Sequence, residues 1–345
     1  MLGLRIGIDF GSSRFTVFVD GRGIVMCEPS VMIADKYSGK ILAIGKTAKK
    51  MSEKLPDSMT VIYPIKDGIV TDREQACFMI RGCINKICYG KLFKPNILMC
   101  VPSTVTPLQK KTVFDVVMAS GAGKACFIDE SLASAIGAGV SLTEPKGTIV
   151  CDIGGGVTDC AVVTMGNIAV SESLKIGGND LTKSIIEYVA RTYKVQIGSS
   201  AAEEIKTSVG SAIPRTTEIA VIVCGKSLES GLPAEVELTS DEVYSVLNPR
   251  VDEILACILR VLEQTPPELS GDITETGIIL TGGTANLFGM AQFVEYHTRL
   301  KTVVAENPHE CAARGIGILL KDLKYLDRNG YIFKSSAANE DESTE

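Results

Sequence analysis

The stretch that decides the fold is Asp152-Ile153-Gly154-Gly155-Gly156-Val157-Thr158-Asp159, and it lies at the end of an apolar run that starts at residue 148. An aspartate at a strand end, followed by glycines, places a carboxylate beside backbone N–H groups that no side chain shields. Metal ions and phosphates bind at such places. A single copy is weak evidence, because Asp-x-Gly more often marks an ordinary turn.

The same arrangement occurs near the start of the chain, where an apolar run from Leu4 ends in Asp9-Phe10-Gly11-Ser12-Ser13. Each aspartate is followed by a second apolar run, a Gly-containing turn and a third run, at residues 15–27 and 160–174. Farther along both halves, strand-length apolar runs alternate with helical periodicity, which predicts α/β layers. Two symmetric copies indicate two lobes that hold one nucleotide between them.

A third glycine element, Leu280-Thr281-Gly282-Gly283-Thr284, also lies between a predicted strand and a predicted helix. In third place after the two Asp-Gly loops, it fits the α-phosphate and adenosine part of a nucleotide. The chain has no G-x-x-x-x-G-K-[ST] loop, and no G-x-G-x-x-G opens a dinucleotide-binding unit. P-loop enzymes and dinucleotide oxidoreductases are therefore excluded.

The composition excludes other functions. Asp plus Glu outnumber Lys plus Arg by 41 to 35, a net charge of −6 that argues against nucleic-acid binding. The 11 cysteines include no C-x-x-C pair, so zinc-ribbon and thioredoxin sites are excluded and the reduced thiols of a cytoplasmic protein are expected. No apolar run approaches the ~18 residues of a spanning helix, and no signal-peptide pattern precedes the first strand.

These motifs resemble the MreB/Mbl family of bacterial actin-like cell-shape proteins, within the superfamily of actin, sugar kinases and DnaK-type chaperones. The resemblance covers residue 7 to about residue 323. Sugar kinases and chaperones share the Asp-Gly loops but lack the Pro-Ile-Lys-Asp-Gly and Ala-Glu-Glu-Ile-Lys stretches. Further collinear matches to the family are Cys27-Glu28-Pro29-Ser30-Val31, residues 64–70, Val101-Pro102-Ser103, residues 135–139 and Ala202-Glu203-Glu204-Ile205-Lys206.

The resemblance implies an α/β, actin-like duplicated ribonuclease-H-like fold, with two lobes that each carry a smaller inserted subdomain. Residues 1–140 are expected to form the first lobe, with its subdomain at about 31–66. Residues 141–323 are expected to form the second lobe, with its subdomain at about 180–238 and its last helix packed back on the first lobe. Residues 335–345 are expected to form a disordered acidic tail.

The resemblance also implies roles for single residues. Asp9 and Asp152 match the aspartates that hold Mg²⁺, largely through its water shell. Glu130 matches the catalytic glutamate that orients the attacking water, and Thr158 matches its helper. From the residues alone, Glu130 is more simply a charge at a helix N-terminus, worth about 0.3 to 1 kcal/mol. The residues implied for ATP or GTP are Gly11, Ser12, Ser13, Arg14, Gly154, Gly155, Gly156, Val157, Glu203, Glu204, Lys206, Gly282, Gly283 and Thr284.

Three departures from the family pattern bear on hydrolysis. Arg14-Phe15 replaces the usual Asn-Thr, Ser131 follows Glu130 where Pro is usual, and Thr284 replaces a third glycine. The side chain of Arg14 either reaches the terminal phosphate or points to solvent. Nucleotide binding tolerates these changes better than fast hydrolysis does. We expect a weak ATPase; the alternatives are a nucleotide-binding scaffold with little hydrolysis and a small-molecule kinase of the same superfamily.

Leu92 and Phe93 lie between Lys91 and Lys94 and match the membrane-insertion pair of the family. The alternative is that both side chains fold back into the core. The resemblance further implies an open homopolymer, with the cytoplasmic membrane surface and membrane proteins of the cell-wall elongation machinery as partners. The sequence thus predicts a cytoplasmic, membrane-associated filament protein that organises cell-wall synthesis and cell shape.

Overall fold

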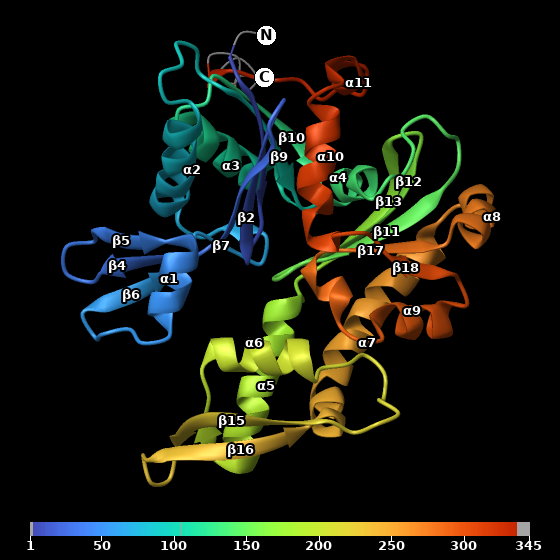
Figure 1. Ribbon diagram of the computed structural model, residues 1–345. Helices are drawn as coiled ribbons and strands as arrows, with labels where there is room; N and C mark the ends of the chain where they lie inside the picture. The colour runs from blue at the N-terminus through green and yellow to red at the C-terminus, as the bar shows by residue number, and fades with distance from the viewer. Residues whose placement is uncertain (1–2, 104, 337–345) are drawn as a thin grey trace.

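The computed structural model describes residues 3–103 and 105–336, which form two lobes (Figure 1). Each lobe is built on a five-stranded sheet. The first sheet consists of β1 (Arg5–Phe10), β2 (Arg14–Val19), β3 (Gly23–Pro29), β9 (Asn96–Val101) and β10 (Lys124–Asp129). The second consists of β11 (Thr148–Ile153), β12 (Thr158–Thr164), β13 (Asn167–Leu174), β17 (Ile278–Thr281) and β18 (Thr302–Val304).

The two sheets have the same topology. The strand order is β10-β9-β1-β2-β3 in the first and β18-β17-β11-β12-β13 in the second. β1 and β11 occupy the same central place, since each pairs antiparallel with the next strand of its hairpin and parallel with a later strand. The duplicated α/β fold predicted from the two Asp-Gly stretches is therefore confirmed.

Helices cover both faces of the sheets. The helices that pack around the two sheets are α2 (Arg73–Ile87), α3 (Pro107–Ala119), α4 (Glu130–Gly137), α7 (Ser240–Gln264), α8 (Pro267–Thr276), α9 (Met290–Thr298) and α10 (Cys311–Leu319). α2 and α3 pack on one face of the first sheet, and α7 packs on one face of the second. α4 and α10 lie between the two sheets (Figure 1). The α4–α10 pair therefore joins the lobes.

The backbones of α4 and α10 approach closely. A Cβ placed on Gly137 would lie 1.8 Å from the carbonyl oxygen of Cys311, and one on Gly315 would lie 1.8 Å from that of Ala133. Only glycine permits this approach. Ile316 of α10 also packs on Gly7 of β1, so the last long helix is seated against the first lobe.

Each lobe carries a smaller subdomain. The first consists of β4 (Met32–Asp35), β5 (Ile41–Ile44), α1 (Gly45–Ser52) and β6 (Met59–Ile62), with the short hairpin of β7 (Ile65–Lys66) and β8 (Ile69–Val70) at its base. The second consists of α5 (Gly178–Tyr193), β14 (Val195–Gln196), α6 (Ser199–Ser208), β15 (Ala220–Ser227) and β16 (Pro233–Thr239). The two subdomains lie on the same side of the molecule, where α1 approaches α6 (Figure 1).

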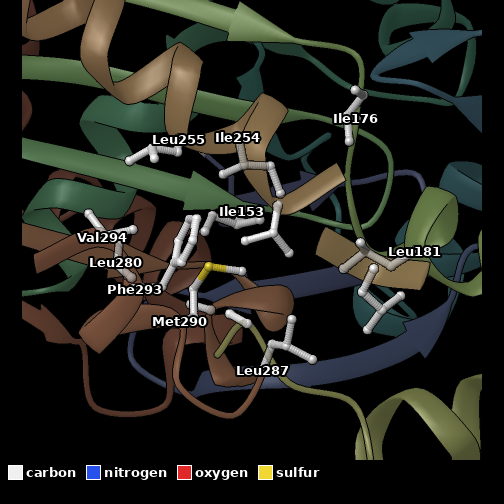
Figure 2. Packing of buried hydrophobic residues seen from close by; sticks show 14 of the residues in the cluster. Ile153, Ile176, Leu181, Ile254, Leu255, Leu280, Leu287, Met290, Phe293 and Val294 are labelled. Atoms are coloured by element: carbon white, nitrogen blue, oxygen red, sulfur yellow. The ribbon is translucent and has the colours of Figure 1, made fainter. Parts of the chain in front are cut away.

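Buried side chains anchor the strand ends that precede the glycine loops. Ile153 is the last residue of β11 and Leu280 lies near the end of β17; both are fully buried in the core of the second lobe (Figure 2). Leu181 of α5 and Leu287 belong to the same cluster. Since these side chains cannot move without opening a cavity in the core, the backbone that follows Ile153 and Leu280 is held in place.

Three helices differ from the sequence prediction. The sequence Asn307-Pro308-His309-Glu310 is a capping pattern that predicts a last helix to about residue 323, whereas α10 ends at Leu319 and a separate α11 (Leu323–Arg328), capped by Asp322, follows. The sequence also predicts a helix over 286–300, which begins only at Met290 because Gly289 has a φ of 77°. The sequence does not predict α8, because Pro266 and Pro267 at its start resemble a loop.

The end of the described chain returns to the first lobe. Lys334 pairs with Ala125 of β10 through two backbone hydrogen bonds of 2.9 Å. The acidic tail predicted over 335–345 lies outside the described residues from 337 onward. Within residues 3–103 and 105–336, no helix is long and apolar enough to cross a membrane.

Candidate functional site

A cavity of about 750 Å³ lies between the two lobes. The ends of β1, β11 and β17 and the N-terminus of α4 form its floor, and residues of α1, α5 and α6 form its mouth. Thr158 and Glu204 are not among its lining residues, and Leu92 and Phe93 lie elsewhere. The predicted site residues that line the cavity are Asp9, Gly11, Ser12, Ser13, Arg14, Glu130, Asp152, Gly154, Gly155, Gly156, Val157, Glu203, Lys206, Gly282, Gly283 and Thr284.

Two strand-end aspartates enter the cavity from opposite lobes. The carboxylate of Asp152 is fixed on one oxygen, Oδ2, which accepts hydrogen bonds from Ser134 (2.6 Å) and Thr281 (2.9 Å). Gly282, with a φ of 83°, passes so close that a Cβ would lie 2.7 Å from the other oxygen, Oδ1. The strand ends and the third glycine loop thus determine where this carboxylate lies.

The electrostatics of the two aspartates depend on burial. Burial raises the pKa of Asp9 to about 7, the charge of Asp152 adds to this effect, and the Arg14 guanidinium opposes it. Burial also raises the pKa of Asp152, while the hydrogen bonds from Ser134 and Thr281 lower it. Because the surroundings of both carboxyl groups disfavour their ionised forms, a positively charged ligand between them would be bound favourably.

Glu130 is the first residue of α4, at the floor of the cavity. Burial raises its pKa well above the usual range, and the charges of Asp9, Asp152 and Asp159 raise it further. The next residue, Ser131, is fully buried, and its hydroxyl lies 3.1 Å from the hydroxyl of Ser103. This contact joins the start of α4 to the loop after β9. It is made by the serine at position 131, where the family that the sequence resembles usually has a proline.

The glycine loops of the two lobes touch each other. Ser13 donates a hydrogen bond to the side-chain oxygen of Asn179 (2.9 Å), and a Cβ on Gly155 would lie 2.0 Å from the Ser13 hydroxyl. In the second lobe, Thr284 donates to the carbonyl of Gly154 (2.9 Å). A residue larger than glycine at position 155 would separate the loops, so the glycine is required by the approach of the first loop.

Lys206 and Glu203 form a partly buried ion pair (2.7 Å) on α6. The ammonium group of Lys206 also donates to the carbonyl of Gly178 and to the hydroxyl of Thr182. Burial lowers the pKa of Lys206. Burial acts to raise the pKa of Glu203, but the charge and hydrogen bond of Lys206 outweigh it and hold that pKa below its usual value. The pair is therefore not the solvated pair that spacing alone suggests.

Of the other predicted residues, Thr158, Leu92 and Phe93 lie apart from the cavity, whereas Arg14 lies at it. Thr158 is fully buried, and its hydroxyl donates to the carbonyl of Ile176 (2.8 Å), which fixes the start of α5 relative to β12. Arg14 lines the cavity and its guanidinium lies 3.7 Å from the sulfur of Cys27. Leu92 is 90% exposed and Phe93 50% exposed, so neither side chain is folded back into the core.

Sequence reasoning missed several residues of the cavity. Lys46 and Lys49 reach it from α1, and Asn179 reaches it from α5. Ser134 and Thr281, which hold Asp152, were also missed. Thr281 directly precedes Gly282 and Gly283 of the third glycine element, at the end of a predicted strand. This position is a signal from which its contact with Asp152 could have been predicted.

The family model described as MreB/Mbl protein matches residues 3–328. This chain belongs to the MreB/Mbl family. It is 39% identical to the cell shape-determining protein Mbl of Bacillus subtilis (strain 168), over 95% of this chain and 99% of that protein. It is 36% identical to the cell shape-determining protein MreB of Escherichia coli (strain K12), over 94% of each. The family predicted from the motifs is thus confirmed.

Several solved structures share the fold of this chain. MreB5 of Spiroplasma citri bound to ADP superposes with a TM-score of 0.90 at 31% identity, over 95% of this chain and 99% of that one. The same protein bound to AMPPNP gives a TM-score of 0.88 over 96% and 99%. The MamK double helical filament gives a TM-score of 0.77 at 18% identity, over 92% and 98%. The actin-like fold is therefore confirmed.

Proposed function

We propose that this MreB/Mbl protein binds ATP, or GTP, together with Mg²⁺ in the cavity between its lobes. The observation that carries the proposal is the meeting of Asp9 and Asp152 with three glycine loops in one cavity of about 750 Å³. Its support from the comparisons is that MreB5 of Spiroplasma citri has been solved with ADP and with AMPPNP.

The donor set fits Mg²⁺. Burial disfavours ionisation of both Asp9 and Asp152, and the charge of Asp152 disfavours that of Asp9 further, which a divalent cation would relieve. Among the described residues, no three His, Cys, Asp or Glu side chains form a metal-binding group. Two carboxylates suit an ion that keeps several waters and takes the rest of its ligands from phosphate oxygens. When bound, Mg²⁺ would neutralise charge on the β- and γ-phosphates.

The chain's own residues supply the other contacts of this proposal. The backbone N–H groups of Gly11 and Gly154 donate to the carbonyls of Arg14 and Val157 and so shape the two loops. The N–H groups of Ser12, Ser13, Gly155 and Gly156 surround the phosphates, and Arg14, which faces the cavity, pairs with the terminal phosphate. Glu203 and Lys206 bind the ribose and purine. Glu130 orients the attacking water and accepts its proton, which makes the protein a weak ATPase. Thr158 supports this geometry through its bond to Ile176.

Calorimetry tests nucleotide binding. Folded protein titrated with ATP or GTP in the presence of Mg²⁺ is expected to release heat, and Asp152→Ala is expected to abolish it. Ser245→Ala, on the exposed side of α7, is a matched control, because its hydroxyl bonds only within the helix. Absence of heat from the wild type with both nucleotides would exclude the proposal.

We further propose that the protein polymerises and acts at the cytoplasmic membrane surface, with membrane proteins of the cell-wall elongation machinery, in determining cell shape. Membership of a family whose relatives are named cell shape-determining proteins supports this role. The exposed Leu92 and Phe93, between Lys91 and Lys94, suit insertion beside anionic lipid headgroups. Each buried side chain contributes roughly 1.5 to 3 kcal/mol, so binding becomes firm when a filament presents many copies.

Co-sedimentation with vesicles of phosphatidylglycerol and phosphatidylcholine tests the membrane part, and electron microscopy of the same samples tests polymerisation. The double variant Leu92→Ser and Phe93→Ser is expected to lose vesicle binding and keep filaments. Tyr37→Ser is the control, because Tyr37 is equally exposed on the first subdomain. Unchanged vesicle binding of the double variant would reject the insertion pair.

A further inference from the structure

Two helices face each other across the mouth of the cavity with matching polar residues. Lys46 and Lys49 of α1 and Glu53, its C-cap residue, face Ser200, Glu203 and Thr207 of α6. Both sets have the spacing i, i+3, i+7, which places three side chains along one face of a helix. Lys46, Lys49, Glu203 and Thr207 line the cavity.

The two faces are in contact at their outer end. The hydroxyl of Ser200 donates a hydrogen bond of 2.6 Å to the carboxylate of Glu53, although the residues are 147 positions apart in the chain. One helical turn before Glu53 lies Lys49, whose positive charge lowers the pKa of both Glu203 and Lys206. The contact therefore joins the subdomain of the first lobe to that of the second, where α1 approaches α6 (Figure 1).

Glu53 and Ser200 are not themselves lining residues of the cavity. A nucleotide held on the three glycine loops extends toward α6, so leaving it would require α1 and α6 to separate. A hydrogen bond to an ionised carboxylate is stronger than one between neutral groups. Breaking it therefore adds to the barrier for release without changing any contact to the ligand.

We propose that Glu53 and Ser200 are positioning residues that hold α1 against α6 and so set the rate at which bound nucleotide leaves. This inference rests on the proposed nucleotide binding. It assigns control of exchange to a single inter-subdomain contact at the cavity mouth, separate from the residues that touch the nucleotide.

Release kinetics of the full chain loaded with Mg²⁺ and a fluorescent ATP analogue, chased with excess ATP in a stopped-flow instrument, test the proposal. Ser200→Ala is expected to speed release by about three- to tenfold, the range that one typical solvent-exposed hydrogen bond supports. Ser208→Ala, whose hydroxyl bonds only within α6, is the matched control and is expected to release at the wild-type rate.

Charge variants separate the contact from an effect on helix stability. Ser200 lies in the first turn of α6, where a negative side chain stabilises a helix and a positive one destabilises it. Ser200→Glu would repel Glu53 and speed release despite stabilising α6, whereas Ser200→Lys would pair with Glu53 and slow release. The double variant Glu53→Lys with Ser200→Glu would return to slow release.

The outcomes distinguish this inference from the function on which it rests. If the wild type binds no analogue, nucleotide binding itself fails. If it binds, and all Glu53 and Ser200 variants release at the wild-type rate, the positioning role is overturned. Release rates that follow helix stability, with Ser200→Glu slow and Ser200→Lys fast, would also overturn it.

Discussion

The hydroxyl of Ser134 donates a hydrogen bond of 2.6 Å to the carboxylate of Asp152, so α4 of the first lobe holds the acidic strand end of the second. Both residues are buried. The contact links the position of this carboxylate to the packing of α4 between the two sheets. A change in the angle between the lobes would therefore reach the cavity through a single buried hydrogen bond.

Ser134→Ala is expected to weaken binding of ATP with Mg²⁺ by about tenfold, since a hydrogen bond to a charged group contributes about 1.5 kcal/mol or more. The bond also lowers the pKa of Asp152, against the effect of burial. Without it that pKa rises further, so the affinity of the variant falls increasingly below that of the wild type as the pH decreases. Calorimetry at two pH values checks this; equal dissociation constants at both would contradict it.

Gly315→Ala is expected to destabilise the protein by several kcal/mol. The added methyl group would lie 1.8 Å from the carbonyl oxygen of Ala133, so α4 and α10 would have to move apart in a close-packed core. Gly271→Ala, in α8, meets nothing within 4 Å and is expected to stabilise by about 0.5 to 1 kcal/mol. Denaturant unfolding compares the two variants, and equal midpoints would refute the close crossing.

Glu203→Gln is expected to lower stability near neutral pH by about 1 to 2 kcal/mol, because it leaves the buried Lys206 without a counter-charge; the estimate is reduced because Glu203 is partly exposed. The folded-state pKa of Glu203 is lowered. Its stabilising effect is therefore complete above the unfolded pKa of about 4.3 and is lost as the pH falls through the folded value. In thermal melts of nucleotide-free protein, the melting temperatures of the wild type and of Glu203→Gln should approach each other as the pH falls. A constant difference at all pH values would contradict the ion pair.

The fold and the floor of the cavity could be predicted from the sequence because their signals are local. Asp9, Asp152 and the glycines that follow them are adjacent in the chain, and strand ends of one sheet meet at one edge. Because the Asp-Gly stretch occurs twice, the sequence predicts one such sheet edge in each lobe, with the two edges facing each other. The third loop followed from the same local rule.

The mouth of the cavity could not be predicted in this way. Lys49 reaches the cavity only because α1 is folded over from an inserted subdomain, and Ser134 reaches Asp152 only because α4 lies between the sheets. Both depend on packing between segments that are far apart in the chain. Thr158 illustrates the converse, since the family resemblance implies a role beside the attacking water, whereas its hydroxyl donates to the carbonyl of Ile176 and the residue does not line the cavity.

Glu130→Gln tests whether the protein hydrolyses the nucleotide that it is proposed to bind. Burial and the charges of Asp9 and Asp152 raise the pKa of Glu130 well above its usual value, which favours the protonated carboxyl group in the ligand-free protein. Cationic charge near those aspartates would lower this pKa and make Glu130 a better acceptor for the proton of the attacking water, which would tie hydrolysis to a loaded cavity. Phosphate release in a single turnover is expected to fall by about 10² to 10⁴ in the variant, with affinity for nucleotide almost unchanged.

Asp129→Asn is the control for this experiment. Asp129 precedes Glu130 at the start of α4, makes no capping hydrogen bond with its side chain and does not line the cavity. The Asp129→Asn variant should therefore hydrolyse bound nucleotide at the wild-type rate. If Glu130→Gln and the wild type release phosphate equally slowly, Glu130 is only a charge at a helix N-terminus. The departures at Arg14 and Ser131 would then mark a protein in which nucleotide binding alone, without turnover, sets the arrangement of the lobes.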